Sequence, residues 1–417
     1  MHAEVIIVGS GAAAVHLATT LIEFGKNVLM VDVGVENPNL DSEIPRKNFT
    51  ELRQIDEKQD SYFLGHNFEA LSWGSVSVGA QLTAPRKYMI EKADDLIPLI
   101  SNTFYPYESL ATGGLGVGWG AGCYTFSDAE LSMCGLQSSK LRESYQIIAD
   151  RIGVSNPGID IVDFTTSHLN NLEPTIRITK HFQKILNHYA IKKTLFNTKG
   201  FYLGEASLAI LGKNRNERKA HAYRDMEFYN DSEKSVYRPW MTLDNLLKKP
   251  NFKYYKNLLI TKYTENPDAV LVQGIDIKTR EKINLTAKIL ALAAGTLGTA
   301  RIVLRSADEV DSLPILCNPY SYYPTINLSQ LGKIIEPDML SLAQLMMFLK
   351  DNDSPADISV SSIYGYNSLM LFRLIKESPF NFAFSRKLFQ LLQSGLVIFG
   401  IHHPDSYTNG TRRLHLE

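Results

Sequence analysis

The sequence predicts an α/β fold, and three observations indicate it. Residues 3–8 (AEVIIV) are a short apolar run of the kind that is buried in a parallel sheet, and a glycine-rich turn and a helical pattern follow at once. Residues 27–32 (NVLMVD) read as a second buried strand. Much later, residues 281–306 repeat the order strand, glycine, helix. The first two strands and the helix between them make one βαβ half-unit.

The helix of this half-unit is expected over residues 12–24 (AAAVHLATTLIEF). Its apolar side chains recur at helical spacing and would share one face: Val15, Leu17, Ala18, Leu21 and Ile22. Gly25 follows directly and is well placed to end the helix, because glycine readily takes the left-handed conformation that closes helices.

The middle of the chain is less regular. Residues 35–107 read as irregular excursions with short helices, and residues 138–193 as helical segments joined by a linker. The glycine-dense stretch 109–127 cannot form a stable helix, but it can bring backbone very close to a ligand. From residue 252 the β pattern returns, and 252–263, 269–278 and 281–295 read as strands, the first two paired.

Composition excludes several classes of function. Lys+Arg 43 against Asp+Glu 44 gives a net charge of −1, so no basic excess would attract a nucleic acid. Three cysteines, Cys123, Cys134 and Cys317, favour reduced thiols over a disulfide framework or a metal site, and therefore a cytoplasmic setting. The first residues enter a strand with no export signal, and no apolar run approaches the ~20 residues of a transmembrane segment.

The central motif is Gly9-x-Gly11-x-x-Ala14, which follows a strand and opens a helix. The first glycine makes a tight turn, the second lets backbone approach a pyrophosphate, and the third position needs a small residue for close helix–strand packing. Phosphates would then lie at the helix N-terminus, where free N–H groups favour negative charge. The predicted phosphate-binding residues are Gly9, Ser10, Gly11, Ala12, Ala13 and Ala14.

Asp32 stands 21 residues after Gly11, at the end of the second strand. A carboxylate at that place can accept hydrogen bonds from ribose hydroxyls and would repel a 2′-phosphate. An ordinary glycine-rich turn is the alternative interpretation of the motif. The strand before it, the helix after it and the acidic partner favour a dinucleotide site.

Four segments resemble the glucose–methanol–choline (GMC) oxidoreductases. VIIVGSGAAAVHLATTLIEFGKNVLMVDVG resembles the FAD fingerprint of that family, and TGGLGVGWGAGCYTFS resembles its second glycine-rich segment near the flavin. ITKY, residues 260–263, is similar to the strand that lines the adenine pocket, and AKILALAAGTLGTARIVLRS resembles a later conserved pattern of the family. Their order and spacing along the chain also fit.

The resemblance implies a Rossmann-type FAD-binding domain built from discontinuous segments and a sheet-based α+β substrate domain. Residues 1–312 would be mainly FAD-binding, with core segments 1–35, 108–130 and 250–306, and residues 313–417 would be the substrate domain. The further cofactor-binding residues that it implies are Gly113, Gly114, Trp119, Gly120, Ile260, Ala294 and Gly295. Trp119 could stack near the flavin or be a core tryptophan, and Cys123 reads as a plain small hydrophobe.

The family chemistry implies that an alcohol or sugar CH–OH is oxidised, with O2, a quinone or a protein as the electron acceptor. FAD is expected to be non-covalent, because no tethering histidine lies between Gly113 and Ser127. Residues 404–416 resemble the P-x-S-x-G hairpin of the substrate domain. In the family, a segment that carries the catalytic histidine follows this hairpin, and no such segment follows it here. We therefore expect either a truncated chain or a branch of the family that has lost its catalytic base.

His402 and His403, followed by Pro404 and later by Gly410 and Thr411, imitate the family's H-P-x-G-T segment. Their spacing is wrong for it, and two histidines at a strand end is the favoured interpretation over a catalytic pair. Two rivals to the main interpretation stay open. One is another flavoenzyme class, such as a ferredoxin-like reductase or an amine oxidase, and the other is a flavin-binding remnant without catalysis.

Overall fold

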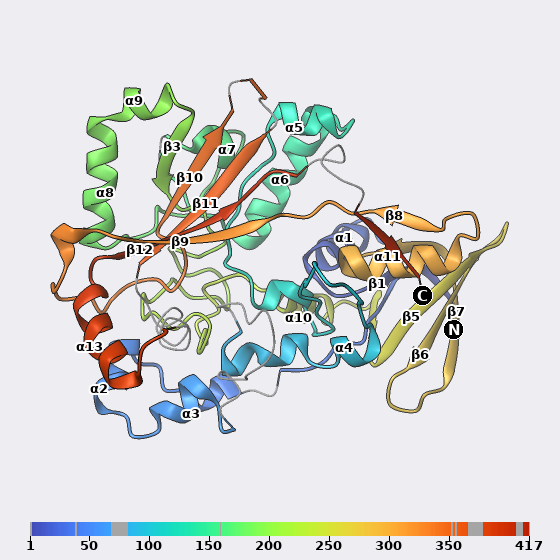
Figure 1. Cartoon of the computed structure of the whole chain (residues 1–417). Helices are drawn as coiled ribbons and strands as arrows, with labels where there is room; N and C mark the ends of the chain where they lie inside the picture. Colours follow the sequence, from blue (N-terminus) through green and yellow to red (C-terminus); the bar gives the residue numbers. More distant parts are fainter. Residues whose placement is uncertain are drawn as a thin grey trace.

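The protein is a mixed α/β structure with two separate main sheets, as the computed structural model shows it (Figure 1). The structure describes residues 2–37, 40–67, 82–158, 160–351, 353–354, 357–365, 378–405 and 412–416. One sheet is six-stranded and mixed, and the other is five-stranded and antiparallel. The α/β class predicted from the sequence is therefore confirmed.

The six-stranded sheet joins the start of the chain to residues 252–292. Its strand order is β4-β2-β1-β7-β6-β5, with β1 central among the parallel strands. β1 pairs in parallel with β2 on one side and β7 on the other, and β7, β6 and β5 continue as antiparallel neighbours. The strands are β1 (His2–Val8), β2 (Val28–Val31), β4 (Phe252–Tyr255), β5 (Leu258–Glu265), β6 (Val270–Asp276) and β7 (Lys282–Leu292).

Both faces of β1 are covered, which explains its unbroken apolar run. Val5 and Ile7 pack with α1 (Ala12–Glu23) and α10 (Pro239–Leu246) in one buried cluster. Ile6 and Val8 pack on the other face with residues of β5 to β7 and of α11 (Gly295–Ser306). The predicted half-unit of strand, helix and strand is thus present within residues 2–31.

Helix α1 ends as expected but turns a different face inward. Gly25 has φ +74°, and the amide of Lys26 donates to the Leu21 carbonyl, as in a glycine-closed helix end. The prediction that Leu17 faces inward is wrong, because its side chain is 38% exposed. His16 is buried instead, with its ring stacked on Tyr237 at 5.7 Å between centroids. The reason is that α1 packs against the neighbouring segment 237–246, so the side of the helix that carries His16 faces inward.

The predicted strand 252–263 is two strands. Asn257 has φ +63°, and this left-handed residue separates β4 from β5. β4 lies at one edge of the sheet beside β2, whereas β5 forms the other edge beside β6. The predicted pairing with residues 269–278 is confirmed for β5, which pairs with β6.

The second sheet has the order β3-β10-β11-β12-β9. Four of its strands follow residue 312, but β3 (Phe201–Glu205) comes from the region expected to be mainly FAD-binding. The other strands of this sheet are β9 (Tyr320–Ile326), β10 (Leu345–Lys350), β11 (Ile358–Gly365) and β12 (Leu396–His402). Its largest buried cluster also takes in Ala149 and Ile152 of α6 (Ser138–Ile152). The division of the chain at residue 312 stays a prediction.

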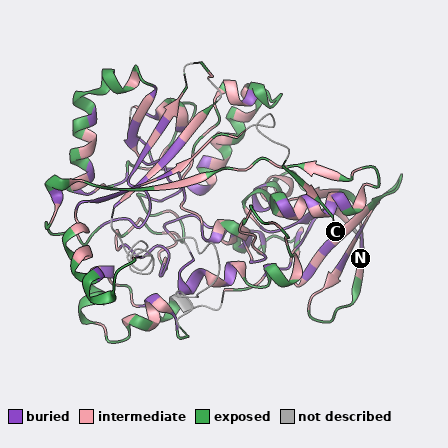
Figure 2. Ribbon diagram, viewed as in Figure 1, coloured by how far each residue is buried: buried purple, intermediate pink, exposed green. Residues whose placement is uncertain are grey.

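Shorter elements complete the described part of the chain. Figure 2 shows the strands of both sheets largely buried or half-buried, while peripheral helices such as α8 and α9 expose much of their surface. Within the described residues, no helix has the length and apolar character needed to cross a membrane. The remaining elements are η1 (Leu40–Glu43), α2 (Phe49–Ile55), α3 (Gln59–Leu64), η3 (Ala84–Ile90), α4 (Ala93–Leu96), η4 (Gly114–Val117), α5 (Asp128–Met133), α7 (Val162–Thr165), α8 (Lys180–Ile191), α9 (Lys193–Asn197), β8 (Ser312–Pro314), η5 (Leu328–Gln330), α13 (Phe382–Leu392) and β13 (Arg413–His415).

Candidate functional site

A cavity of about 860 Å³ lies at the carboxyl ends of the parallel strands. Val8 and Leu292, the last residues of β1 and β7, line it, and so does Asp32, directly after β2. The chain leaves β1 toward β2 on one side, while β7 lies on the other side. In open α/β sheets, ligands bind outside the carboxyl ends of the strands where the strand order reverses in this way.

Gly9 is required by the fold itself. Its φ is +101°, a conformation that side chains other than glycine rarely adopt. A Cβ at this position would also lie 2.4 Å from the carbonyl oxygen of Ala293, just after β7. The Gly9 amide donates to the Val31 carbonyl at 2.8 Å. Gly9 therefore lets the chain turn tightly between the ends of the neighbouring strands.

Gly11 is different, because none of the described residues requires a glycine there. It is the N-cap of α1, with φ −67° and ψ −178°, which any residue can adopt. A Cβ on Gly11 would meet only the Gly113 carbonyl oxygen, at 3.9 Å, which is ordinary contact. Gly11 lines the cavity. The free space beside it is therefore the place where a ligand could approach the backbone.

The first turn of α1 faces the same cavity. Ala12 and Ala13 line it and are exposed, and no side chain caps the helix. Uncapped N–H groups and the helix dipole favour an anion at such a helix start. Ala14 is fully buried against the sheet, as expected of a small residue at the third position of the motif.

Asp32 lines the cavity at its β2 end. Burial raises the pKa of its carboxyl to about 6, although hydrogen bonds from Ser10 and from the amides of Val33 and Gly34 oppose the shift. The Ser10 hydroxyl donates to Oδ2 of Asp32 and accepts from the Gly113 amide at 2.9 Å. Ser10 thus joins the end of β1, the end of β2 and the second glycine-rich segment.

The cavity brings together most of the predicted cofactor-binding residues. Those that line it are Gly9, Ser10, Gly11, Ala12, Ala13, Asp32, Gly114, Ile260, Ala294 and Gly295. Ala14, Gly113, Trp119 and Gly120 do not. Trp119 is half-buried against the core of the second sheet, and its indole N–H donates to the Tyr237 carbonyl at 2.8 Å.

A second helix begins at this cavity. Ala294 is the N-cap of α11, and Gly295 takes φ +74° as the chain turns from β7 into the helix. Thr296 and Leu297 follow in the first turn and line the cavity, and no side chain caps this helix either. The N-termini of α1 and α11 thus meet at one cavity from different parts of the chain.

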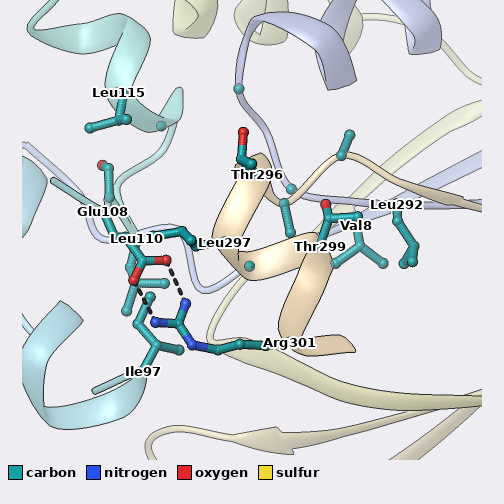
Figure 3. Close-up of a pocket in the computed structure, with 18 of the residues that line it drawn as sticks. Val8, Ile97, Glu108, Leu110, Leu115, Leu292, Thr296, Leu297, Thr299 and Arg301 are labelled. Atoms are coloured by element: carbon teal, nitrogen blue, oxygen red, sulfur yellow. Dashed lines mark hydrogen bonds and ion pairs between the residues drawn. The ribbon is translucent and has the colours of Figure 1, made fainter. Parts of the chain in front are cut away.

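The sequence did not reveal an ion pair in the cavity wall. Arg301 of α11 and Glu108 bind each other through two contacts, of 2.5 and 2.6 Å, and their side chains are only 13% and 14% exposed (Figure 3). Arg301 lies in a segment quoted for the family resemblance, but Glu108 carries no local signal, because its partner is 193 residues away. The pair holds segment 104–111 against α11.

Apolar side chains form much of the remaining wall. Ile97, Leu110 and Leu297 line it around the ion pair, and Figure 3 shows them on different elements. Ile260 of β5, the residue expected at the adenine, is buried and lines the β2 end of the cavity together with Leu258. A mostly apolar cavity with a few directed polar groups is typical of a cofactor site.

His402 and His403 do not line this cavity. His402 is the last residue of β12, its ring lies 4.4 Å from that of Tyr320, and burial lowers its pKa. Nε2 of His403 lies 3.2 Å from the Ser321 hydroxyl. Gly410 and Thr411 of the segment compared with H-P-x-G-T, and the turn of the predicted hairpin, lie outside the described residues.

Comparisons with known proteins supply no family for this chain. No protein-family model matches it, and a search of curated proteins found no match. The functional interpretation therefore depends on the residues of the cavity and on the sequence motifs.

Proposed function

We propose that the cavity binds the adenosine diphosphate part of non-covalent FAD, and that the protein is an FAD-dependent oxidoreductase acting on the CH–OH group of an alcohol or sugar. The observation that carries the proposal is Gly11. Its glycine is not needed by the fold, yet it stands at the uncapped start of α1, beside the carboxyl ends of β1 and β2. A pyrophosphate that approaches the backbone explains that choice of residue.

Each part of the adenosine diphosphate has matching residues in this proposal. The amides of Ala12 and Ala13 would bind the pyrophosphate, with the dipole of α1 favouring its charge. The carboxylate of Asp32 would accept hydrogen bonds from the ribose hydroxyls. Ile260 and Leu258 offer an apolar surface suited to an adenine ring.

The reaction class is supported by the resemblance to the GMC oxidoreductases. The flavin, when bound, would supply the hydride acceptor. The protein must also hold the substrate and remove its hydroxyl proton, which requires a base within hydrogen-bond reach. No histidine is among the described residues that line the cavity. The base is therefore unassigned, and a flavin-binding protein without catalysis is the second candidate function.

Measurements of the bound cofactor and of its reduction and reoxidation test the proposal. The purified protein should carry a yellow chromophore with a flavin absorption spectrum, and acid precipitation should release FAD into the supernatant. Flavin that stays with the pellet would contradict non-covalent binding, and NAD(H) in place of flavin would refute the cofactor assignment. Reduction of the bound flavin by a panel of alcohols and sugars under anaerobic conditions then separates an oxidoreductase from a non-catalytic flavoprotein. Reoxidation of the reduced flavin by O2, by a quinone or by an oxidised electron-transfer protein identifies the electron acceptor.

A further inference from the structure

Helix α13 exposes a stripe of apolar side chains. Phe380, Phe384, Lys387 and Leu391 follow one another at spacings of four, three and four, which places them along one side of a helix. Phe380 precedes the first turn, and its ring lies 4.9 Å from that of Phe384. The three apolar residues are 53%, 50% and 52% exposed. We call these four residues the α13 stripe.

The α13 stripe lies away from the side of the helix that packs on the protein. Ser385 is the buried residue of α13, and its hydroxyl lies 2.8 Å from that of Ser378. Leu388 and Phe389 are half-buried beside it. The helix therefore has one apolar side that contacts the protein and a second apolar edge that faces solvent.

A neighbouring segment extends this surface. The amide of Gly332 donates to the Leu391 carbonyl at 3.1 Å, so residues 328–334 lie against the C-terminal end of α13. Leu328 and Ile334 in this segment are 75% and 97% exposed. Figure 1 shows α13 at the edge of the molecule, on the other side of the view from α11, whose N-terminus lines the cavity. Soluble proteins rarely leave such apolar side chains together at the surface without a partner.

The two segments that form this surface carry only basic charges. Residues 320–335 and 378–396 contain Lys333, Arg386 and Lys387 and no Asp or Glu. All three basic residues are exposed. The nearest acidic residues along the chain are Glu377, directly before Ser378 in the sequence, and Glu336, whose Oε1 accepts from the Lys180 amide.

We propose that the α13 stripe and residues 328–334 bind the surface of an anionic lipid bilayer. Phe and Leu side chains next to Lys and Arg are typical of helices that lie in the membrane interface. Protein interfaces, in contrast, are depleted in lysine. The eleven residues of α13 span only about 16 Å, well short of the ~30 Å hydrocarbon core, so the helix would lie on the bilayer. This inference does not depend on the cofactor proposal.

Vesicle flotation of the full chain tests it. Vesicles of phosphatidylcholine with 30 mol% phosphatidylserine, against pure phosphatidylcholine, are the probes. We expect the protein to float with the anionic vesicles at low salt and to be released at 0.5 M NaCl. Phe384→Ser together with Leu391→Ser should lower the partition coefficient about tenfold or more. Arg386→Gln and Lys387→Gln should lower it by about fivefold for each charge.

Matched controls separate this surface from general exposure. Phe24, directly after α1, and Ile191 of α8 are 77% and 80% exposed. The double variant Phe24→Ser with Ile191→Ser should therefore float to the same extent as the unchanged protein. All variants should keep their thermal midpoints within a few degrees, because the substituted side chains are exposed. No flotation of the unchanged protein, equal binding to neutral vesicles, or equal loss in the control would overturn the proposal. Micromolar self-association that only Phe384→Ser with Leu391→Ser abolishes, without vesicle binding, would instead identify a second copy as the partner.

Discussion

The hydroxyl of Ser10 donates a hydrogen bond to the carboxylate of Asp32, on the neighbouring strand end. The same hydroxyl accepts the Gly113 amide, so one small side chain orders three segments around the cavity. One carboxylate oxygen of Asp32 is thus engaged by the protein before any ligand arrives. The hydrogen bond also fixes the direction in which the carboxylate faces the cavity.

Asp32 should lower the stability of the cofactor-free protein at neutral pH. Its folded pKa of about 6 is above its ordinary 3.8, so between these values the folded state binds the proton more tightly than the unfolded state. Stability is therefore favoured below pH 3.8 and is lost as the pH rises through 6. Asp32→Asn should raise the free energy of unfolding by about 1–3 kcal/mol at pH 7.5 and by much less at pH 4.5. Urea denaturation at both pH values measures this, and an unchanged or lower value at pH 7.5 would contradict it.

The same substitution should weaken FAD binding. An amide at position 32 loses one charge-assisted hydrogen bond to the ribose, worth roughly 1.5–3 kcal/mol, so the Kd for FAD should rise about tenfold to a hundredfold. Titration of the cofactor-free protein with FAD, followed by quenching of flavin fluorescence, gives the Kd. Asp276→Asn is a suitable control, because Asp276 caps an exposed turn outside the cavity. Equal affinity in the Asp32→Asn protein would remove Asp32 from the site.

Gly9 and Gly11 should respond differently to valine. Gly9→Val places a branched side chain at φ +101° and against the Ala293 carbonyl, so it should destabilise or unfold the protein. Gly11→Val fits the backbone and has room, so its thermal midpoint should stay within a few degrees of the unchanged protein. It should nevertheless abolish flavin binding, because the side chain occupies the ligand space. Thermal melts and flavin content of both variants check this, and full flavin content in Gly11→Val would show that phosphates bind elsewhere.

Breaking the Glu108–Arg301 pair should affect both stability and the cavity. Arg301→Ala leaves a mostly buried carboxylate without its partner, which should cost about 2–4 kcal/mol. Arg301→Lys should restore only part of this, because an ammonium cannot make both contacts of the guanidinium. The exposed pair Lys248–Glu217 is the control, and Lys248→Ala should cost less than about 1 kcal/mol. Urea unfolding of the three variants measures these free energies. Equal losses in Arg301→Ala and Lys248→Ala would show that the buried pair stabilises the protein no more than the exposed pair does.

His402→Ala and His403→Ala should leave any alcohol or sugar oxidation within about twofold of the unchanged protein. Neither histidine lines the cavity, and His402 contacts the ring of Tyr320 instead. Steady-state rates and their pH dependence for both variants test this. A loss of two orders of magnitude or more in either variant, the size expected for removal of a general base, would make that histidine the catalytic residue.

The sequence predicted the local parts of this structure well, because short patterns determine them. The strand before Gly9, the end of α1 at Gly25 and the place of Asp32 after β2 all follow from neighbouring residues. It could not predict pairings between distant residues. Glu108 meets Arg301, and β3 joins the second sheet, through packing that no local pattern records. The sequence predicted one strand over 252–263, whereas the structure has two strands separated at Asn257. A single residue with positive φ does not change the apolar pattern around it, so the pattern could not indicate this break.

The pairing of β1 with β7 determines when this protein can fold during its synthesis. Val5 pairs with Ile289, so the central strand lacks one of its two neighbours until 284 more residues have been made. At about 5–20 residues per second, a ribosome needs on the order of 15–60 s for this distance. During that time the apolar edge of β1 is open to wrong pairing. We therefore expect the nascent chain to depend on chaperones. Expression at lower temperature, or together with an excess of a chaperone that binds nascent chains, should raise the yield of folded protein.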